Sequence, residues 1–213
     1  PENVPAHRPA LLHALGAEIV RTAASSGMRG AMAQAEALVA QTPGAVCLQA
    51  FSNRGNARIH SDTTAHEIWH DTDGAVRVVV VPIGTGGTAA GCASFLRSRG
   101  VHVIGVEPSG SAVLNGKPAG AHDIPGLGAG FVPSLLTKDT LDETVDVADA
   151  DARSAVRLLA REESILVGPA GGAVLHAAIT VAKRAEHQGQ IVVAILPDSG
   201  ERFCDHRTYR LED

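Results

Sequence analysis

The sequence has few of the features that mark nucleic-acid-binding, membrane-spanning or disulfide-stabilised proteins. Its formal net charge is −5 and it has no basic stripe, which argues against a nucleic-acid partner. No apolar run reaches the length of a membrane span, and we expect no signal peptide. The three cysteines, Cys47, Cys92 and Cys204, lie far apart without a CxxC pair. We therefore expect no membrane association, disulfide or structural zinc, and a cytoplasmic location.

Lysine and aromatic residues are also scarce. Arginine outnumbers lysine fifteen to three, and the lysines are Lys117, Lys138 and Lys183. Aromatic residues make up 3% of the chain, whereas apolar residues, mostly Ala, Val and Leu, make up 45%. This composition is typical of an α/β protein whose helices pack through small side chains.

Predicted strands and helices alternate along the chain. A β-branched run at residues 76–83 predicts a buried strand, residues 149–162 predict an amphipathic helix, and residues 191–196 predict the last strand. Shorter strands are expected at residues 18–20 and 45–48. The alternation predicts a mostly parallel sheet with helices on both faces and ligands at the carboxyl ends of its strands.

A glycine-rich turn follows the strand at 76–83 and leads into a segment with helical spacing. We call it the first glycine turn; its residues are Gly84, Thr85, Gly86, Gly87 and Thr88. Glycines allow close backbone approach, and a helix start with converging N–H groups favours an anion. The pattern predicts a phosphate site, and the alternative is a tight turn without a ligand.

The same turn also permits a dinucleotide-binding interpretation. Gly84, Gly86 and Ala89 match the GxGxxG/A pattern, and Glu107 ends the following strand, where an acidic residue would bind a ribose. This Rossmann alternative, with a nicotinamide or flavin cofactor, is disfavoured by the motifs found further along the chain.

A zinc-hydrolase interpretation comes from a second motif. Residues 66–70 read HExxH, with His66 and His70 as ligands and Glu67 as base. A turn at residues 71–74 interrupts the helix at once, and no third ligand follows in the expected pattern. The simpler interpretation is a short solvated helix with Trp69 packed inward.

Several motifs, in their order and spacing, carry a family resemblance. They include Glu67-Ile68-Trp69 with Asp71-Thr72-Asp73-Gly74, the first glycine turn, Gly105-Val106-Glu107-Pro108, Ile124-Pro125-Gly126-Leu127-Gly128-Ala129-Gly130-Phe131, and Leu196-Pro197-Asp198-Ser199-Gly200-Glu201-Arg202-Phe203. With these motifs the chain resembles, over nearly its whole length, the cysteine synthase (O-acetylserine sulfhydrylase) family and its relative cystathionine β-synthase.

The resemblance implies a fold, a cofactor and a reaction. These are fold-type-II enzymes with a tryptophan-synthase-β-like fold, and they use pyridoxal 5′-phosphate to replace the acetate of O-acetylserine by sulfide. It implies a division into residues 1–45, an incomplete remnant of the smaller N-terminal domain, and residues 46–213, the large cofactor-binding domain. It further implies an amino-acid substrate, a homodimer and serine acetyltransferase as a partner.

The resemblance also suggests individual site residues. The first glycine turn would bind the 5′-phosphate of the cofactor. Gln49, at the end of the strand expected at 45–48, and Gly128, in a mobile loop, would lie near the substrate. A surface polar residue and a flexible surface turn are the alternatives for these two.

Two departures from the family pattern affect catalysis. The Ser-x-Lys-Asp-Arg stretch, whose lysine forms a Schiff base with the cofactor, and the Ser-Gly-Asn-Thr-Gly substrate loop do not occur in these 213 residues. Ala170 stands where the family has a serine at the pyridine nitrogen, and Asp198 or a water is the candidate replacement. We expect the chain alone to be inactive, the alternative role being a non-catalytic pseudoenzyme that binds a partner.

Overall fold

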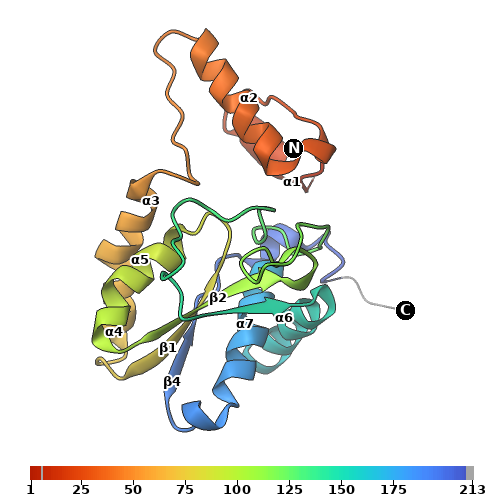
Figure 1. Cartoon of the computed structure of the whole chain (residues 1–213). Helices are drawn as coiled ribbons and strands as arrows, with labels where there is room; N and C mark the ends of the chain where they lie inside the picture. The colour runs from red at the N-terminus through yellow and green to blue at the C-terminus, as the bar shows by residue number, and fades with distance from the viewer. Residues whose placement is uncertain (6, 210–213) are drawn as a thin grey trace. The chain divides into compact units, whose positions relative to one another are not determined.

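The computed structural model describes residues 1–5 and 7–209, in two compact units, Pro1–Gln49 and Ala50–Asp213. The first unit holds helix α1 (His7–Ala14), a 3₁₀ turn (Ala24–Ser26) and helix α2 (Gly27–Gln41). The second unit holds every strand of the described residues. Figure 1 shows the elements in chain order.

The first unit lacks the two short strands that the sequence predicted. Residues 18–20 and 45–48 have no regular structure, so both predictions were wrong. A β-strand requires a neighbour for its backbone hydrogen bonds, and the described part of this unit has no second strand to pair with. None of its described side chains is buried, and Leu15 and Val46 are 75% and 82% exposed.

The second unit is an α/β layer structure. A continuous helical stretch comprises α3 (Arg54–Ile59), a π-helical turn (His60–Thr64) and α4 (Ala65–Asp71). The remaining elements are β1 (Val76–Pro82), α5 (Gly87–Leu96), β2 (His102–Pro108), β3 (Glu143–Val147), α6 (Asp149–Glu163), α7 (Pro169–Ala182) and β4 (Ile191–Ala194), with 3₁₀ turns at Arg97–Arg99, Ser109–Ser111, Ala185–His187 and Gly200–Phe203.

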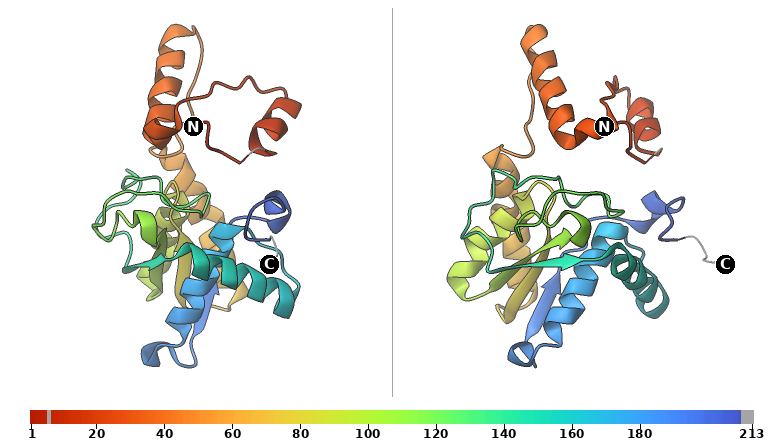
Figure 2. Two further views of the ribbon diagram at one scale, coloured as in Figure 1. Left: turned by 90° about the vertical axis from the view of Figure 1, so that its right-hand side faces the viewer. Right: turned by 45° about the vertical axis from the view of Figure 1, so that its right-hand side comes forward.

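The four strands form a parallel sheet in the order β3-β2-β1-β4, which confirms the predicted sheet type. Successive residues of β1 face opposite sides. Val78 and Val80 pack in the core beneath α7, while Val79 and Val81 pack in the core beneath α5. Helices therefore cover both faces, as Figures 1 and 2 show.

The direction of the chain through the sheet reverses beside β1. From β1 the chain passes through α5 to β2 on one side, whereas β4, on the other side of β1, is reached through α7 on the opposite face. In open parallel sheets, ligands bind at the carboxyl ends of strands where the order reverses in this way. The first glycine turn follows β1 and lies at this point.

Candidate functional site at the carboxyl end of strand β1

The first glycine turn connects β1 directly to α5. Gly86 has φ = 83°, a left-handed conformation that glycine adopts without strain, and it is the N-cap of α5. Gly86 has no side chain that could cap this helix, and the Gly87 N–H makes only a long hydrogen bond of 3.4 Å to the side chain of Thr85. The α5 N-terminus, with its positive dipole end, therefore remains open to an anion.

Close neighbours occupy the space that side chains would fill on these glycines. A Cβ at Gly84 would lie 2.5 Å from the carbonyl oxygen of Gly126, and one at Gly87 would overlap the Asn56 amide. Glycine at 84 and 87 is thus needed for packing of the turn against the loop at 126 and against α3.

Asn56 of α3 supports the first threonine of the turn. Its Nδ2 donates to Thr85 Oγ1 at 2.9 Å and to the Ala50 carbonyl at 2.7 Å. The amide therefore fixes the rotamer of Thr85 while leaving the hydroxyl hydrogen of Thr85 free to donate to a ligand.

His60 supports the second threonine. His60 Nε2 lies 3.2 Å from Thr88 Oγ1, and Nδ1 lies 2.9 Å from Thr64 Oγ1. Burial lowers the pKa of His60 and so favours the neutral ring, which has one donor and one acceptor nitrogen. His60 begins the π-helical turn, a feature often found at functional sites.

A second glycine turn, residues 168–172, begins α7 but differs from the first in one respect. Asp198 accepts hydrogen bonds from the Ala170 nitrogen at 3.0 Å and from the Gly171 nitrogen at 2.7 Å. Burial raises the pKa of Asp198, and the two N–H donors oppose that rise. The carboxyl group thus occupies the N-terminus of α7 and closes it to external anions.

The structure brings several of the predicted site residues together around Gly126. Gly84 meets the Gly126 carbonyl, and the Ala170 methyl group lies 3.8 Å from a Cβ built on Gly126. The Gly128 nitrogen donates to the Ile83 carbonyl at 3.1 Å, directly before the first glycine turn. Both Asp198 oxygens are bound to the backbone next to Ala170, which is 2% exposed.

Gln49 is the last residue of the first unit. The sequence predicted that Gln49 follows a strand, but residues 45–48 form none. The Gln49 backbone is left-handed, with φ = 49°. Its neighbour Leu48 is 79% exposed.

The three lysines lie away from the first glycine turn or are engaged elsewhere. Lys117 forms an ion pair with Asp146 at 2.9 Å. Lys183 is at the far end of α7, about 20 Å along the helix from its N-terminus. Lys138 is exposed and precedes Asp139, whose carbonyl accepts a bond from Arg97 beyond the far end of α5.

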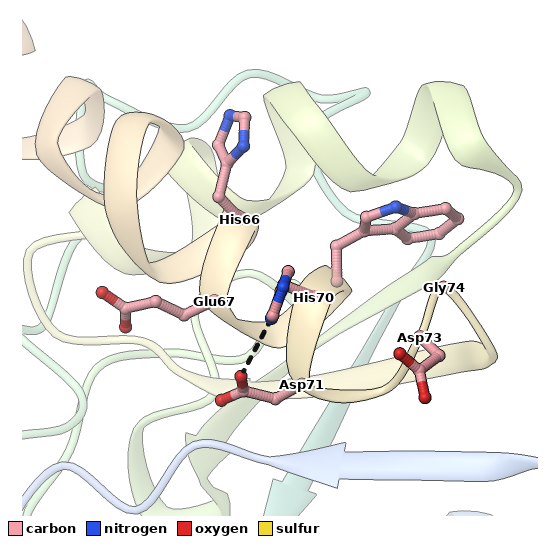
Figure 3. Close-up of a pocket in the computed structure, with 7 residues that line it drawn as sticks. His66, Glu67, His70, Asp71, Asp73 and Gly74 are labelled. Carbon is pink, nitrogen blue, oxygen red and sulfur yellow. Dashed lines mark ion pairs between the residues drawn. The ribbon is translucent and has the colours of Figure 1, made fainter.

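The HExxH motif does not form a metal site. His66 stacks on Phe95 with 3.8 Å between ring centroids, and His70 pairs with its neighbour Asp71 at 3.5 Å. His66, Glu67 and His70 line an open hollow, and their three side chains point in different directions (Figure 3). The described residues include no cluster of three or more metal-binding side chains. The hollow also lies before β1, at the opposite end of that strand from the first glycine turn.

The acidic residue of the dinucleotide interpretation is engaged inside the protein. Glu107 is 1% exposed and accepts a hydrogen bond from the Leu114 nitrogen at 2.9 Å. Burial raises its pKa, and the backbone N–H groups of Leu114, Asn115 and Val113 counteract this. The carboxyl group supports the segment after β2 and is not presented to a ribose.

Comparison with known proteins agrees with this geometry. The family model described as "Pyridoxal-phosphate dependent enzyme" matches residues 1–198. The chain belongs to this family. Its members use pyridoxal phosphate, and the predicted resemblance to cysteine synthases is confirmed.

Among individual relatives, cysteine synthase A of Escherichia coli is 39% identical over 95% of this chain and 66% of its own length. The crystal structure of cysteine synthase from Entamoeba histolytica has a TM-score of 0.93 and 36% identity, and the match covers 100% of this chain and 64% of that one. An O-acetylserine-dependent cystathionine β-synthase from Helicobacter pylori has a TM-score of 0.93, 33% identity and coverages of 99% and 69%.

The fold-type-II architecture is therefore that of the cysteine synthase structures. The chain spans slightly less than two thirds of the length of the first two of these proteins. No helix in the described part of the chain is long and apolar enough to span a bilayer.

Sequence reasoning missed the two residues that support the threonines. Asn56 and His60 are four residues apart, so a helix places them on one face, and this spacing was the available signal. The first glycine turn fits a phosphate, because it combines an open helix N-terminus with two hydroxyl groups. Among the described residues, no lysine side chain forms a hydrogen bond or ion pair with that turn.

Proposed function

We propose that this chain binds pyridoxal 5′-phosphate through the first glycine turn and forms the cofactor-binding part of a cysteine synthase-like enzyme. The observation that carries the proposal is the difference between two helix N-termini at one edge of the sheet. The α7 N-terminus is capped by the Asp198 carboxyl group, whereas the α5 N-terminus has no carboxylate and only a long 3.4 Å bond from the Gly87 nitrogen to Thr85 Oγ1. A dianionic phosphate is stabilised at the open end.

The roles of the residues follow from their contacts. The first-turn N–H groups of α5 and the hydroxyls of Thr85 and Thr88 would donate to the phosphate oxygens. Asn56 and His60 would orient those two hydroxyl groups through their hydrogen bonds to Thr85 and Thr88. Gly128 and Ala170, beside Gly126, would form a wall of the site, and the methyl group of Ala170 offers no hydrogen bond to a pyridine nitrogen.

The reaction of the complete enzyme would be a β-replacement on an activated serine. The cofactor, when bound, withdraws electrons from the α-carbon of the amino acid. A lysine must hold that cofactor and move the α-proton, and none of the three lysines of this chain lies in the motif that supplies this lysine in the family. We therefore propose that the 213-residue chain alone binds the cofactor without turnover. The relatives are named for different products, cysteine and cystathionine, so the choice of sulfide as the attacking nucleophile is part of the proposal.

Binding can be tested by calorimetric titration of the chain with pyridoxal phosphate and, separately, with inorganic phosphate. Thr85→Val and Thr88→Val should each weaken binding of both ligands about tenfold, because each removes one hydrogen bond to a charged group. Thr180→Val is the matched control, since Thr180 bonds to the His176 carbonyl on the exposed side of α7. Absence of binding by the wild-type chain would refute the proposal.

Turnover is tested separately with O-acetylserine, sulfide and added cofactor. No cysteine should form, and production of cysteine would contradict the proposed inactivity while leaving the binding proposal intact.

The exposed apolar side chains of the first unit favour a second role, as a partner-binding pseudoenzyme. Sedimentation of the chain alone and with serine acetyltransferase tests both that role and the proposed homodimer.

A further inference from the structure

Four consecutive residues near the carboxyl end form hydrogen bonds and ion pairs with distant segments of the second unit. We call them the C-terminal clasp: His206, Arg207, Thr208 and Tyr209. They follow the 3₁₀ turn Gly200–Phe203 and belong to none of the contacts described above. Their contacts reach α6, the residue before the second glycine turn, and the loop that contains Gly126.

Asp123 is where the clasp meets this loop. His206 Nε2 lies 3.2 Å from Asp123 Oδ1, and Arg207 Nε pairs with Asp123 Oδ2. Arg153 of α6 lies 3.8 Å from the same Oδ2. The Asp123 and His206 side chains are only 22% and 14% exposed, so the contact between them is weakly screened by solvent, whereas the Arg207 side chain is 63% exposed.

The remaining members of the clasp are bound on the other side. The Thr208 carbonyl accepts from Arg157 Nε of α6 at 3.1 Å, and the Thr208 side chain is fully buried. Tyr209 donates its hydroxyl to the Val167 carbonyl at 2.7 Å. The Thr208 nitrogen lies 3.3 Å from His206 Nδ1, which orients the other ring nitrogen towards Asp123. The clasp is thus bound to α6 and to residue 167. Its His206 and Arg207 side chains in turn bind Asp123.

Asp123 immediately precedes the loop 124–130, which contacts the first glycine turn. The next residue, Ile124, is fully buried, and the carbonyl of Gly126 lies against Gly84. On the other side, His122 Nε2 lies 3.2 Å from the Gly128 carbonyl. Displacement of Asp123 would therefore move residues 124–130 relative to the open end of α5.

We propose that the C-terminal clasp positions the loop 124–130 against the first glycine turn through Asp123. Asp123, His206 and Arg207 are positioning residues, since none of them contacts the turn itself. The consequence for phosphate binding rests on the proposed function, whereas the consequence for the loop does not.

The test compares Asp123→Asn and Arg207→Gln with the wild-type chain by hydrogen–deuterium exchange. Exchange of residues 124–130 should accelerate about tenfold in both variants, because each removes one charge from the ion pairing of Asp123. Arg202→Gln is the control, being an exposed arginine of the preceding 3₁₀ turn. Arg207→Lys retains the charge and should restore most of the protection.

A ligand measurement separates positioning from general stability. Inorganic phosphate should bind several-fold more weakly to both variants, while exchange in β1 and β2 stays as in the wild type. Faster exchange confined to residues 204–209, or equal acceleration across the whole sheet, would overturn the proposal. If the wild type bound no phosphate but the loop responded as expected, the proposed function would fail and the positioning would stand.

Discussion

Asp198 accepts the Gly171 N–H at 2.7 Å, although the two residues are 27 positions apart in the chain. This bond closes the N-terminus of α7 with a group from the segment after β4. Of the two helices that begin with a glycine turn, only α5 is left open to a ligand, so the bond helps to select where an anion binds.

Replacement of Asp198 tests this selection. Asp198→Ala should lower the free energy of unfolding by about 1–2 kcal/mol, because the cap of α7 is lost. It should also create a second, weaker phosphate site at α7. Urea denaturation measures the first effect and calorimetric stoichiometry the second. Asp198→Asn keeps one acceptor oxygen and should show a smaller loss of stability. A single site of unchanged affinity in Asp198→Ala would show that the carboxyl group does not block α7.

Removal of the Asn56 amide should weaken phosphate binding without direct contact to the ligand. Asn56→Ala frees the Thr85 hydroxyl to rotate, and we expect a three- to tenfold loss of affinity, on the order of 1 kcal/mol. Asn115→Ala is the matched control, because Asn115 bonds to the Thr144 carbonyl and Asp146, away from the first glycine turn. Equal losses in both variants would indicate general destabilisation.

The Arg184–Glu143 pair should make stability depend on acidic pH. The Arg184 hydrogen bond, opposed by burial, lowers the pKa of Glu143, so the group binds fewer protons when folded. Its contribution is present above the unfolded pKa of about 4.3 and is lost as the pH falls through the lower folded value. Glu143→Gln should reduce the loss of urea stability between pH 7 and pH 3. The difference should be below about 1 kcal/mol, since both side chains are roughly a third exposed.

The first unit should be cleaved before the second. None of its described side chains is buried, and a segment without a core opens at little cost in free energy. Limited proteolysis should cut within residues 1–49 first and leave a product that begins near Ala50, identified by mass spectrometry. Initial cleavage inside the sheet would contradict this expectation.

Local patterns were sufficient to predict the sheet and the first glycine turn. The valine run of β1 and the following glycines are contiguous, so both patterns can be recognised locally, and β1 finds its partner strands in β2 and β4. The strand at 45–48 was predicted wrongly because its valine and leucine require a partner strand that the described residues of the first unit lack. The sequence also could not predict that Asp198 caps α7. The two segments are distant in the chain, and only the folded structure brings them into contact.

The supports of the first glycine turn come from nearby in the chain, and this has a consequence for folding. The Asn56–Thr85 and His60–Thr88 contacts span 29 and 28 residues, whereas the His206–Asp123 contact spans 83. Shorter loops close at a smaller entropic cost, so contacts between near neighbours form sooner. On refolding, the first glycine turn should therefore acquire its supporting side chains before the clasp closes, and the loop 124–130 should be the last part of the site to order.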